Sequence, residues 1–543
     1  MRFRITITNL LITLIAAAGS INVVLADTKN LFLPTPPMGF NNWARFECNL
    51  NQTLFTTTAE AMIKTNLLNV GYNRINIDDC WMTNERSSEN NSLQWNTTIF
   101  PDGLIWLGDY LHQRGFHFGI YEDAGTETCS GLPGSLGFEE IDAYTFQNWG
   151  IDYLKLDGCN LPDFDGLNDE ETYQSVYGKW HEVLSNMSNP LIFSESAPAY
   201  FSDMSNLTDW YTVMGWCPVY GQLARHSADI ATYGSGDYWE SILFNYGQEV
   251  LVARYQKPGY FNDPDFLIPD YPDLTIHEKK SQFALWASFS APLIISAYIP
   301  NLTSEELDYL TNTDLIAVDQ DPLGLQATLV SQDGTWDVLT KNLENGDRLL
   351  TVLNRGNSSA NYSVSLSRLG FSSPCTVQVK DLWSGEMTTT TLSVDMSIPP
   401  HGTAAFRISS KSQTCGDIIP TGMIFNTKSL NCLKGTTNSS VSTEPCDATD
   451  KQVWQVKPDG SIRNLANPSH CLKEGAKGRV SLTSCGTVSP SQKWKYYQSG
   501  NVVNVLSGNC LTEKNTSVPL TATSCLYEAN SQVFGMPSGV EVL

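Results

Sequence analysis

Residues 152–160 are Asp152-Tyr153-Leu154-Lys155-Leu156-Asp157-Gly158-Cys159-Asn160, a short run that ends abruptly in a carboxylate, a glycine and a cysteine. The run predicts a buried β-strand. A single aspartate at a strand end usually belongs to a turn or caps a helix. In a parallel α/β barrel, however, catalytic side chains project from the carboxyl ends of strands, and Lys155 shares the face of Asp157. A catalytic role for Asp157 therefore depends on whether other strands end in the same way.

The region from residue 27 to 325 alternates strand-like runs with helical stretches, the pattern of repeated βα units. Eight units in roughly 290 residues suit a (β/α)8 TIM barrel, which typically needs about 250 residues. The expected strands are 38–41, 74–77, 117–121, 153–156, 191–194, 210–214, 259–262 and 293–297. The sequence therefore predicts an α/β fold class.

From residue 326 to 408 the pattern changes to alternating strands without a clear helix, which predicts an antiparallel β-sandwich. The expected strands are 335–340, 348–353, 362–366, 376–381 and 403–407. Residues 409–418 begin with a polar run and are predicted to be a linker.

Residues 419–543 contain an internal repeat. A Cys-Leu pair recurs about every 39 residues, and each pair is followed by a second cysteine and a Gln-x-aromatic triplet. The cysteines of the three repeats are Cys432 and Cys446, Cys471 and Cys485, and Cys510 and Cys525. Each repeat is too small to hold a core, so a closed threefold assembly with one disulfide per repeat is expected. The Cys-Leu pair and the Gln-x-Trp triplet closely resemble the ricin-type β-trefoil, which we expect to fold as an independent unit.

The first 26 residues have the features of a signal peptide. Arg2 and Arg4 precede an apolar run, and Val24-Leu25-Ala26 supplies small residues at a cleavage position. No later segment approaches eighteen uncharged apolar residues, so a secreted protein without a membrane span is expected. Removal of this leader changes the formal charge from −24 to −26. Such an acidic chain argues against nucleic acid or an anionic membrane as a partner.

The chain has thirteen cysteines, so at least one is unpaired or pairs between chains. No Cys-x-x-Cys pair is present, and disulfides are therefore preferred over a metal site, with no cofactor expected. Glycosylation fits a secreted protein and is predicted at Asn51, Asn90, Asn96, Asn186, Asn206, Asn301, Asn357, Asn361, Asn438 and Asn515.

Several predicted barrel strands end in polar groups with tryptophans beside them, as at Asp78-Asp79 and at Arg225 with Asp229. This composition indicates a sugar pocket, because acids bind hydroxyls and an indole stacks on the apolar face of a sugar. Glycoside cleavage needs two carboxylates, and Asp157 and Asp229 are the pair we select. Asp78-Asp79 could instead bind a metal, but no histidine or third carboxylate keeps ligand spacing with them.

Seven motifs lie in order along the barrel. They are 36–43 (PPMGFNNW), 77–81 (IDDCW), 119–125 (GIYEDAG), 153–160 (YLKLDGCN), 225–230 (RHSADI), 262–265 (NDPD) and 319–324 (DQDPLG). In this order they resemble the secreted α-galactosidase / α-N-acetylgalactosaminidase family of retaining glycoside hydrolases. The resemblance spans residues from about 30 to 410.

The resemblance implies roles for individual residues. It makes Asp157 the nucleophile and Asp229 the acid/base, with disulfides Cys48–Cys80 and Cys129–Cys159. The substrate-binding residues that it implies are Phe40, Asp78, Asp79, Tyr121, Lys155, Ser196, Ala199 and Arg225. Phe40 stands where the family usually has tryptophan, and we expect it to keep an aromatic wall.

Residues 193–200 depart from the family pattern, because the usual cysteine is absent. Its partner would be Cys217, which we therefore expect to be unpaired; Cys375 and Cys415 are either joined or free. Ser196 and Ala199 match the small pair of the α-N-acetylgalactosaminidases, where the α-galactosidases have Glu and a bulky group. We therefore expect a preference for N-acetylgalactosamine, with α-galactosidase as the alternative, although Glu195 would bind the 2-hydroxyl if the alignment shifted by one residue.

A secreted lectin with an inactive barrel is the alternative from a different class. The presence of both Asp157 and Asp229 favours the enzyme. The trefoil is a candidate for carbohydrate binding, but the usual Asp and Asn of its lectin sites are missing. These positions hold Lys434, Lys473 and Thr512, and Lys451, Ser491 and Ser531.

Overall fold

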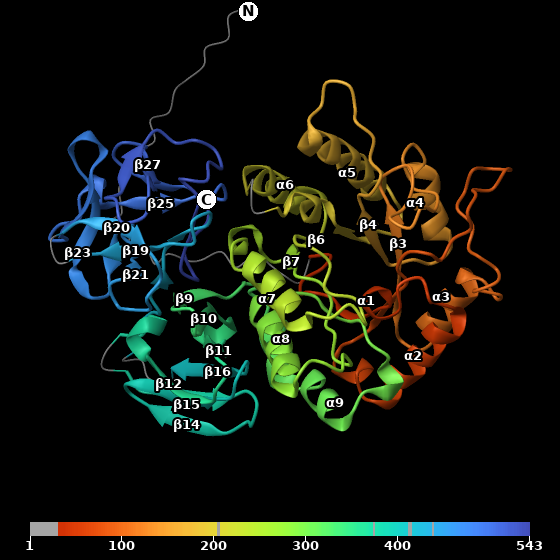
Figure 1. Cartoon of the computed structure of the whole chain (residues 1–543), viewed down its shortest axis with the longest axis horizontal. Coiled ribbons are helices and arrows are strands. Elements are labelled where there is room, and N and C mark those ends of the chain that lie inside the picture. The colour runs from red at the N-terminus through yellow and green to blue at the C-terminus, as the bar shows by residue number, and fades with distance from the viewer. Residues whose placement is uncertain (1–30, 204–206, 373–374, 411–414, 437–438) are drawn as a thin grey trace, which may run out of the picture.

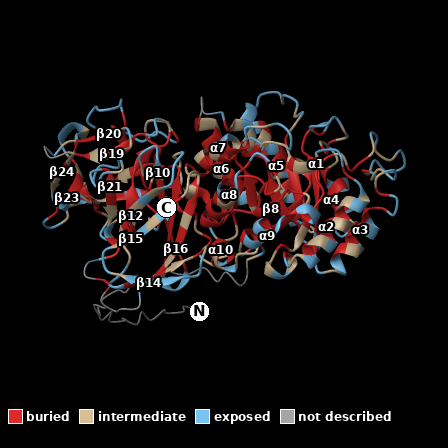
Figure 2. Ribbon diagram, turned by 60° about the horizontal axis from the view of Figure 1, so that its bottom comes forward, coloured by how far each residue is buried: buried red, intermediate tan, exposed pale blue. Residues whose placement is uncertain are grey.

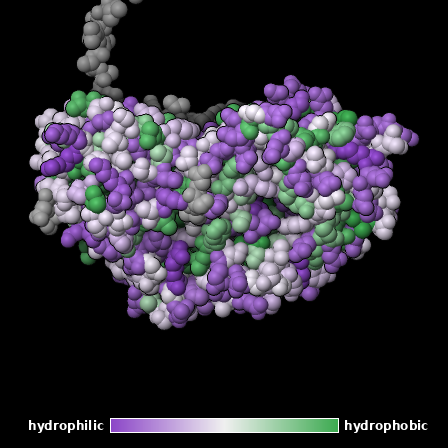
Figure 3. Space-filling model, turned by 45° about the horizontal axis from the view of Figure 1, so that its top comes forward, coloured by the Kyte–Doolittle hydropathy of each residue, from purple (hydrophilic) through white to green (hydrophobic). Residues whose placement is uncertain are grey.

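The computed structural model describes residues 31–203, 207–372, 375–410, 415–436 and 439–543 (Figure 1). The predicted signal peptide, Asn206, Asn438 and residues 411–414 of the predicted linker lie outside the described residues. The chain forms a barrel, a β-sandwich and a three-lobed β domain, with the last two on the same flank of the barrel. On the face shown in Figure 3, hydrophilic residues cover most of the surface, as the acidic composition leads one to expect.

The barrel is built on eight parallel strands in the order β7-β6-β5-β4-β3-β2-β1-β8. The strands are β1 (Met38–Asn41), β2 (Arg74–Asn76), β3 (His117–Asp123), β4 (Tyr153–Asp157), β5 (Ile192–Glu195), β6 (Leu223–Arg225), β7 (Phe261–Asp263) and β8 (Leu293–Ile295). A parallel bridge from Leu267 to Ile295 links the segment after β7 to β8. The carboxyl ends of the strands therefore surround one mouth.

Helices surround the strands and account for most of the remaining barrel residues. They are α1 (Trp43–Phe46), α2 (Gln52–Lys64), α3 (Leu104–His112), α4 (Glu139–Asn148), α5 (Asp169–Ser185), α6 (Leu207–Tyr220), α7 (Tyr238–Glu249), α8 (Ile276–Phe289), α9 (Ser304–Leu310) and α10 (Thr313–Asp319). Figure 2 shows the strands and the inner helix faces as buried and the outer faces as exposed. Gly119 allows β2 and β3 to approach, because a Cβ there would lie 2.0 Å from Oδ1 of Asn76.

The sixth strand was predicted wrongly. Residues 210–214 lie inside α6, and β6 follows that helix at Leu223–Arg225. Trp210, Val213 and Met214 are fully buried. The less buried face of the helix carries Thr212, Gly215 and Val219 instead of charged side chains, so the helical period is weak in the sequence. A short apolar run of this kind cannot be assigned from periodicity alone.

The sandwich contains a six-stranded antiparallel sheet in the order β14-β13-β16-β11-β10-β9 and a pair, β12-β15. Its strands are β9 (Thr328–Gln332), β10 (Trp336–Asn342), β11 (Arg348–Asn354), β12 (Ala360–Ser365), β13 (Val377–Asp381), β14 (Met387–Thr390), β15 (Ser393–Ile398) and β16 (Thr403–Ser410). The sequence analysis missed β9, β14 and β15. β14 is largely exposed, so it lacks the apolar alternation that predicts a strand.

The C-terminal domain has three lobes of short antiparallel strands. They are β17 (Thr421–Met423), β18 (Phe425–Asn426), β19 (Cys432–Gly435), β20 (Val441–Glu444), β21 (Val453–Val456), β22 (Ile462–Asn464), β23 (Asn467–Glu474), β24 (Val480–Ser484), β25 (Trp494–Tyr496), β26 (Val502–Asn504), β27 (Cys510–Thr512), β28 (Thr521–Thr523) and β29 (Phe534–Gly535). The aromatic residues of the three triplets, Trp454, Trp494 and Phe534, are buried together in its core. The predicted fold class, a TIM barrel with a sandwich and a trefoil, is confirmed.

The trefoil packs directly on the barrel. Glu528 is fully buried, and its side chain accepts a hydrogen bond from Thr212 of α6 at 2.9 Å. Arg254 of the barrel donates from Nε to the carbonyl of Gln498 at 2.9 Å. Phe425 of the trefoil belongs to the same buried apolar cluster as the barrel core. The trefoil therefore has a core of its own and also packs on the barrel through hydrogen bonds and an apolar contact.

The structure contains the disulfides Cys48–Cys80, Cys129–Cys159, Cys375–Cys415, Cys432–Cys446, Cys471–Cys485 and Cys510–Cys525. Among the described cysteines, Cys217 is the free one, and it is buried. Cys375 and Cys415, whose pairing the sequence left open, are joined.

Candidate active site

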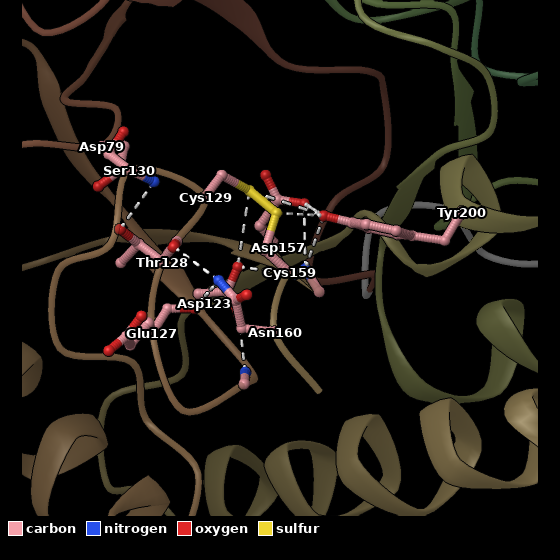
Figure 4. Close-up of a disulfide and its surroundings, with 12 residues drawn as sticks. Asp79, Asp123, Glu127, Thr128, Cys129, Ser130, Asp157, Cys159, Asn160 and Tyr200 are labelled. Atoms are coloured by element: carbon pink, nitrogen blue, oxygen red, sulfur yellow. Dashed lines mark hydrogen bonds between the residues drawn. A yellow bond between two sulfur atoms is a disulfide. The ribbon is translucent and has the colours of Figure 1, made fainter. Parts of the chain in front are cut away.

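Asp157 stands at the carboxyl end of β4, and its carboxylate is held from one side (Figure 4). Oδ1 accepts hydrogen bonds from the Tyr200 hydroxyl at 2.5 Å and from the backbone N–H of Gly158 at 3.0 Å. The same hydroxyl lies 3.1 Å from Sγ of Cys159. Among the described residues, hydrogen bonds reach only Oδ1, which leaves the other oxygen available for chemistry.

Asp123 ends β3 and lies beneath the same group of residues (Figure 4). Its two oxygens accept from the backbone N–H groups of Gly125 at 2.7 Å and Cys159 at 2.9 Å. Burial, followed by the negative charge of Asp157, raises the pKa of Asp123 to about 8. A second carboxyl group, whose pKa is raised, thus supports the loop that carries Asp157.

This group also resembles a metal site by distance. Ligand atoms of Asp123, Cys129, Asp157 and Cys159 all lie within 4.8 Å of one another. The two sulfur atoms, however, form a disulfide and offer no thiolate to an ion. The donor set therefore does not fit a metal.

Asp229 follows β6 and pairs with Arg225 at its end. Nη2 of Arg225 lies 2.9 Å from Oδ1 of Asp229, and Nη1 lies 3.1 Å from Oδ1 of Asp265. Desolvation opposes ionisation of Asp229, but the charges of Arg225 and Lys155 outweigh it and lower the pKa of Asp229. The Asp229 side chain is 62% exposed, so it can reach a ligand in the mouth.

Lys155 connects the acids of the mouth. Its Nζ donates to Oδ2 of Asp78 at 2.7 Å, and Asn41 donates to the same oxygen at 2.7 Å. Burial lowers the pKa of Lys155, but Asp78, Asp157 and Asp229 outweigh burial and raise it. The side chains at the ends of β2, β4 and β6 therefore act on one ammonium group.

Asp79 and Tyr121 lie around the same mouth. Asp79 accepts from the backbone of Cys80 at 2.6 Å and of Ser130 at 3.2 Å, and burial raises its pKa. The Tyr121 ring lies 5.0 Å from Nζ of Lys155. The structure thus brings together Asp78, Asp79, Tyr121, Lys155, Asp157, Arg225 and Asp229.

Phe40 does not form an aromatic wall, and this prediction was wrong. Its side chain is fully buried and meets Phe55 of α2 at 6.4 Å between ring centroids. Side chains alternate along a strand, so Phe40 points outward to the helix while Asn41 reaches Asp78. Trp43, which also contributes to the low pKa of Asp229, is the aromatic residue at this edge of the mouth.

Ser196 and Ala199 lie just beyond β5. The backbone N–H of Ser196 donates to the carbonyl of Leu156 at 3.0 Å, and its buried hydroxyl has no hydrogen-bond partner among the described residues. Ala199 is in the short helix η3 (Ala197–Phe201), directly before Tyr200. Both small residues therefore lie close to the strand end that carries Asp157.

Glu195 faces the other side of β5. Its carboxyl lies so near Gly221 that a Cβ there would be 2.4 Å from Oε1. Burial raises the pKa of Glu195, and the Cys217 thiol is a neighbour. The shift that would make Glu195 a sugar ligand does not occur in the structure.

The sequence analysis assigned no role to Tyr200. No local pattern marks it, because it lies 43 residues from Asp157 in sequence and meets it only through η3. The sequence did mark Asp123 and Asp265 as candidate site residues, because both follow predicted strands. Their individual roles depend on contacts that the sequence does not show.

Comparisons with known proteins were made for the whole chain. Residues 35–321 match the family described as "Alpha galactosidase A", residues 333–408 match "Alpha galactosidase C-terminal beta sandwich domain", and residues 420–534 match "Ricin-type beta-trefoil lectin domain". "Alpha-galactosidase A" of Aspergillus niger is 56% identical over 514 residues, covering 94% of this chain and 93% of that protein. "Alpha-galactosidase 2" of Arabidopsis thaliana is 37% identical over 352 residues, covering 64% of this chain and 83% of that protein.

Solved structures agree with these matches. Alpha-galactosidase I from Mortierella vinacea is 27% identical with a TM-score of 0.63, covering 70% of this chain and 98% of that one. Alpha-galactosidase from Saccharomyces cerevisiae is 25% identical with a TM-score of 0.60, covering the same shares. These structures match 70% of the chain, and the family models match the barrel and the sandwich. The chain belongs to the alpha-galactosidase A family of glycoside hydrolases.

Proposed function

We propose that the protein is a retaining exo-glycosidase that removes terminal α-D-galactosyl residues by double displacement. The observation that carries this proposal is the convergence of Asp157 and Asp229 on Lys155 from separate strand ends. The double displacement needs one carboxylate to attack the anomeric carbon and another to protonate the leaving oxygen. Both groups are present, which argues against a lectin with an inactive barrel.

In the first step, the free oxygen of Asp157 attacks while Tyr200 and Gly158 hold Oδ1. Asp229 donates its proton to the departing oxygen, and a covalent glycosyl-enzyme forms. In the second step, Asp229 takes a proton from a water molecule whose oxygen attacks the anomeric carbon, so the bond to Asp157 breaks and the sugar is released. Asp78, Asp79, Lys155 and Arg225 supply charged groups that orient the sugar hydroxyls.

The expected preference for N-acetylgalactosamine is not supported by the comparisons. Relatives that match nearly the whole chain are named alpha-galactosidase A, which favours the alternative. We therefore propose α-galactosidase as the main activity. Ser196 and Ala199 leave space near the strand end, which would tolerate a substituent on carbon 2 without requiring one.

The ratio of kcat/KM for aryl α-galactoside and aryl α-N-acetylgalactosaminide tests this proposal. We expect the galactoside to be preferred by more than about tenfold, roughly 1.4 kcal/mol of transition-state binding. A preference in the other direction would return the assignment to α-N-acetylgalactosaminidase. Ser196→Glu should raise the ratio further, since a carboxylate there would exclude an acetamido group.

Secretion, the glycosylation sites and the domain boundaries at 26, 325, 408 and 418 also belong to this proposal. No helix among the described residues is both long and apolar enough to cross a membrane. We propose that the trefoil supports the barrel and that its lectin-site positions are already taken up by contacts within the trefoil. Lys434 forms an ion pair with Asp447 at 2.6 Å, and the hydroxyl of Thr512 lies 2.9 Å from that of Thr523. A sugar would need to displace these contacts.

A further inference from the structure

A groove of about 400 Å³ lies on the barrel, and none of the candidate active-site residues lines it. It is lined by Asn90, Ser92, Leu93, Gln94, Trp95, Thr97, Thr145, Asn148 and Trp149. Its walls come from the loop between β2 and α3 and from the end of α4. Asn90, at its edge, is the acceptor residue of an Asn-x-Ser sequon.

The groove combines aromatic faces with unused polar groups. Trp95 and Trp149 meet edge to face at 5.2 Å between ring centroids, and Trp95 is only half-buried. Among the described residues, neither the side-chain amides of Gln94 and Asn148 nor the Trp95 indole N–H has a hydrogen-bond partner. An indole face with nearby amide groups suits a sugar that carries both hydroxyl and acetamido groups.

The loop that carries Asn90 is held in place. Arg86 donates to the carbonyl of Asn91 at 2.9 Å and binds both oxygens of Asp142 on α4, at 2.7 and 2.6 Å. Met82 and Trp95 pair across the base of the loop. The attachment point is therefore fixed relative to the groove before any sugar is added.

The Asn90 amide is also oriented. Its Oδ1 accepts from the hydroxyl of Ser92 at 2.8 Å and from the Ser92 backbone N–H at 3.2 Å. Its Nδ2 has no hydrogen-bond partner among the described residues, so it is free to carry a substituent.

We propose that this groove is the seat of the N-linked glycan on Asn90, whose first N-acetylglucosamine units pack on Trp95, which the buried Trp149 supports from the core side. This inference rests on the proposed secretion of the protein. The groove volume is within the range of about 300 to 1,000 Å³ found for small-ligand pockets. Because the glycan is tethered at the edge of the groove, its effective concentration there is high.

Site-resolved deglycosylation tests the proposal. The full chain is secreted from a yeast host, and glycopeptide mass spectrometry measures occupancy at Asn90 and at Asn361. Asn361 is the matched control, since it is exposed on β12 and lines none of the described grooves. An endoglycosidase that cleaves between the first two sugars is then applied to the native protein.

The glycan on Asn90 should be released about tenfold more slowly than that on Asn361, equivalent to about 1.4 kcal/mol of seating. Heat-denatured protein should release both at equal rates. Trp95→Ala should abolish the difference while occupancy stays unchanged. Because Trp95→Ala could weaken the fold, the double variant Gln94→Ala and Asn148→Ala, at two exposed positions, should reduce the protection independently.

Equal release rates in the native protein would overturn the proposal, and so would an unmodified Asn90 beside an occupied Asn361. Absence of glycan at both sites of the secreted protein would overturn the glycosylation assignments at Asn90 and Asn361 and the proposal with them. Aryl α-galactoside hydrolysis, measured in the same samples, reports separately on the proposed catalytic function. Neither Trp95 nor Asn148 contacts the residues assigned to catalysis, so activity should remain unchanged.

Discussion

The mouth of the barrel and the three lobes of the trefoil both arise from repetition of one unit, but they use repetition differently. Each barrel strand ends in a different polar group, and these groups converge, as Asp78, Asp157 and Asp229 do on Lys155. The trefoil lobes repeat the same residues, and Trp454 and Trp494 face inward to one core. Different polar side chains that meet at one mouth provide catalytic groups, whereas repeated aromatic side chains that face one core stabilise the fold.

Catalysis at the barrel mouth should depend on single atoms. Asp157→Asn keeps the size of the side chain but removes the anionic nucleophile. We expect kcat for an aryl α-galactoside to fall by about 10⁴-fold or more, with an unchanged circular dichroism spectrum. Turnover near that of the parent enzyme would remove Asp157 from the role of nucleophile.

Asp229→Ala should give a smaller and more selective loss. Substrates with poor leaving groups should lose about 10² to 10⁴-fold, while activated aryl glycosides lose less, because they need little protonation. Azide should restore the second step. Since Arg225 and Lys155 lower the pKa of Asp229, the parent should gain activity as the pH falls, and the variant should lose this dependence.

If azide has no effect and every substrate loses activity equally, another residue is the acid/base. Arg225→Lys is a useful partner variant. It keeps a positive charge but loses the guanidinium that spans Asp229 and Asp265.

Asp157 could be selected from sequence because it ends a strand that the sequence shows. Asp229 follows β6, which was misplaced, and its role as the acid/base was assigned through the resemblance of residues 225–230 to the family motif. The fold class was predictable, since strand and helix periods alternate. The position of β6 was not predictable, because the outer face of α6 carries few charged residues and its sequence shows no clear helical period. The role expected for Phe40 was wrong because side chains alternate along β1, and this side chain points away from the mouth to Phe55. The role of Tyr200 depends on its tertiary contact with Asp157, which no local sequence pattern encodes.

The trefoil should contribute to stability and not to catalysis. A chain that ends at residue 418 keeps the Cys375–Cys415 disulfide but loses the cover over Tyr211 and Arg254, which are buried in the full protein. We expect its melting temperature to fall by at least about 5 °C, equivalent to roughly 2 kcal/mol. The folded fraction should keep its kcat on small aryl glycosides, because no trefoil residue reaches the described mouth.

Glu528→Gln is the mild counterpart of that truncation. It keeps the size of a buried side chain that contacts Thr212 and should cost about 1 kcal/mol. A melting temperature unaffected by either change would show that the contact with α6 does not stabilise the barrel.

The smallest expected effect concerns Asp123, where the barrel mouth uses a carboxyl group for support. Burial and Asp157 raise its pKa to about 8 from an ordinary value near 3.8. A folded-state pKa above the unfolded value means that the folded protein holds the proton more tightly. The contribution of Asp123 to stability is therefore complete below about pH 4 and is lost as the pH rises through about 8.

Asp123→Asn cannot ionise, so its melting temperature should fall less between pH 5 and pH 9 than that of the parent. Asn also keeps one oxygen to accept from Gly125 or Cys159 but loses the second acceptor, so a lower melting temperature at pH 5 is expected. Parallel pH profiles for the two proteins would show that Asp123 is ionised in the folded state, and the support for Asp157 would then come from an anion.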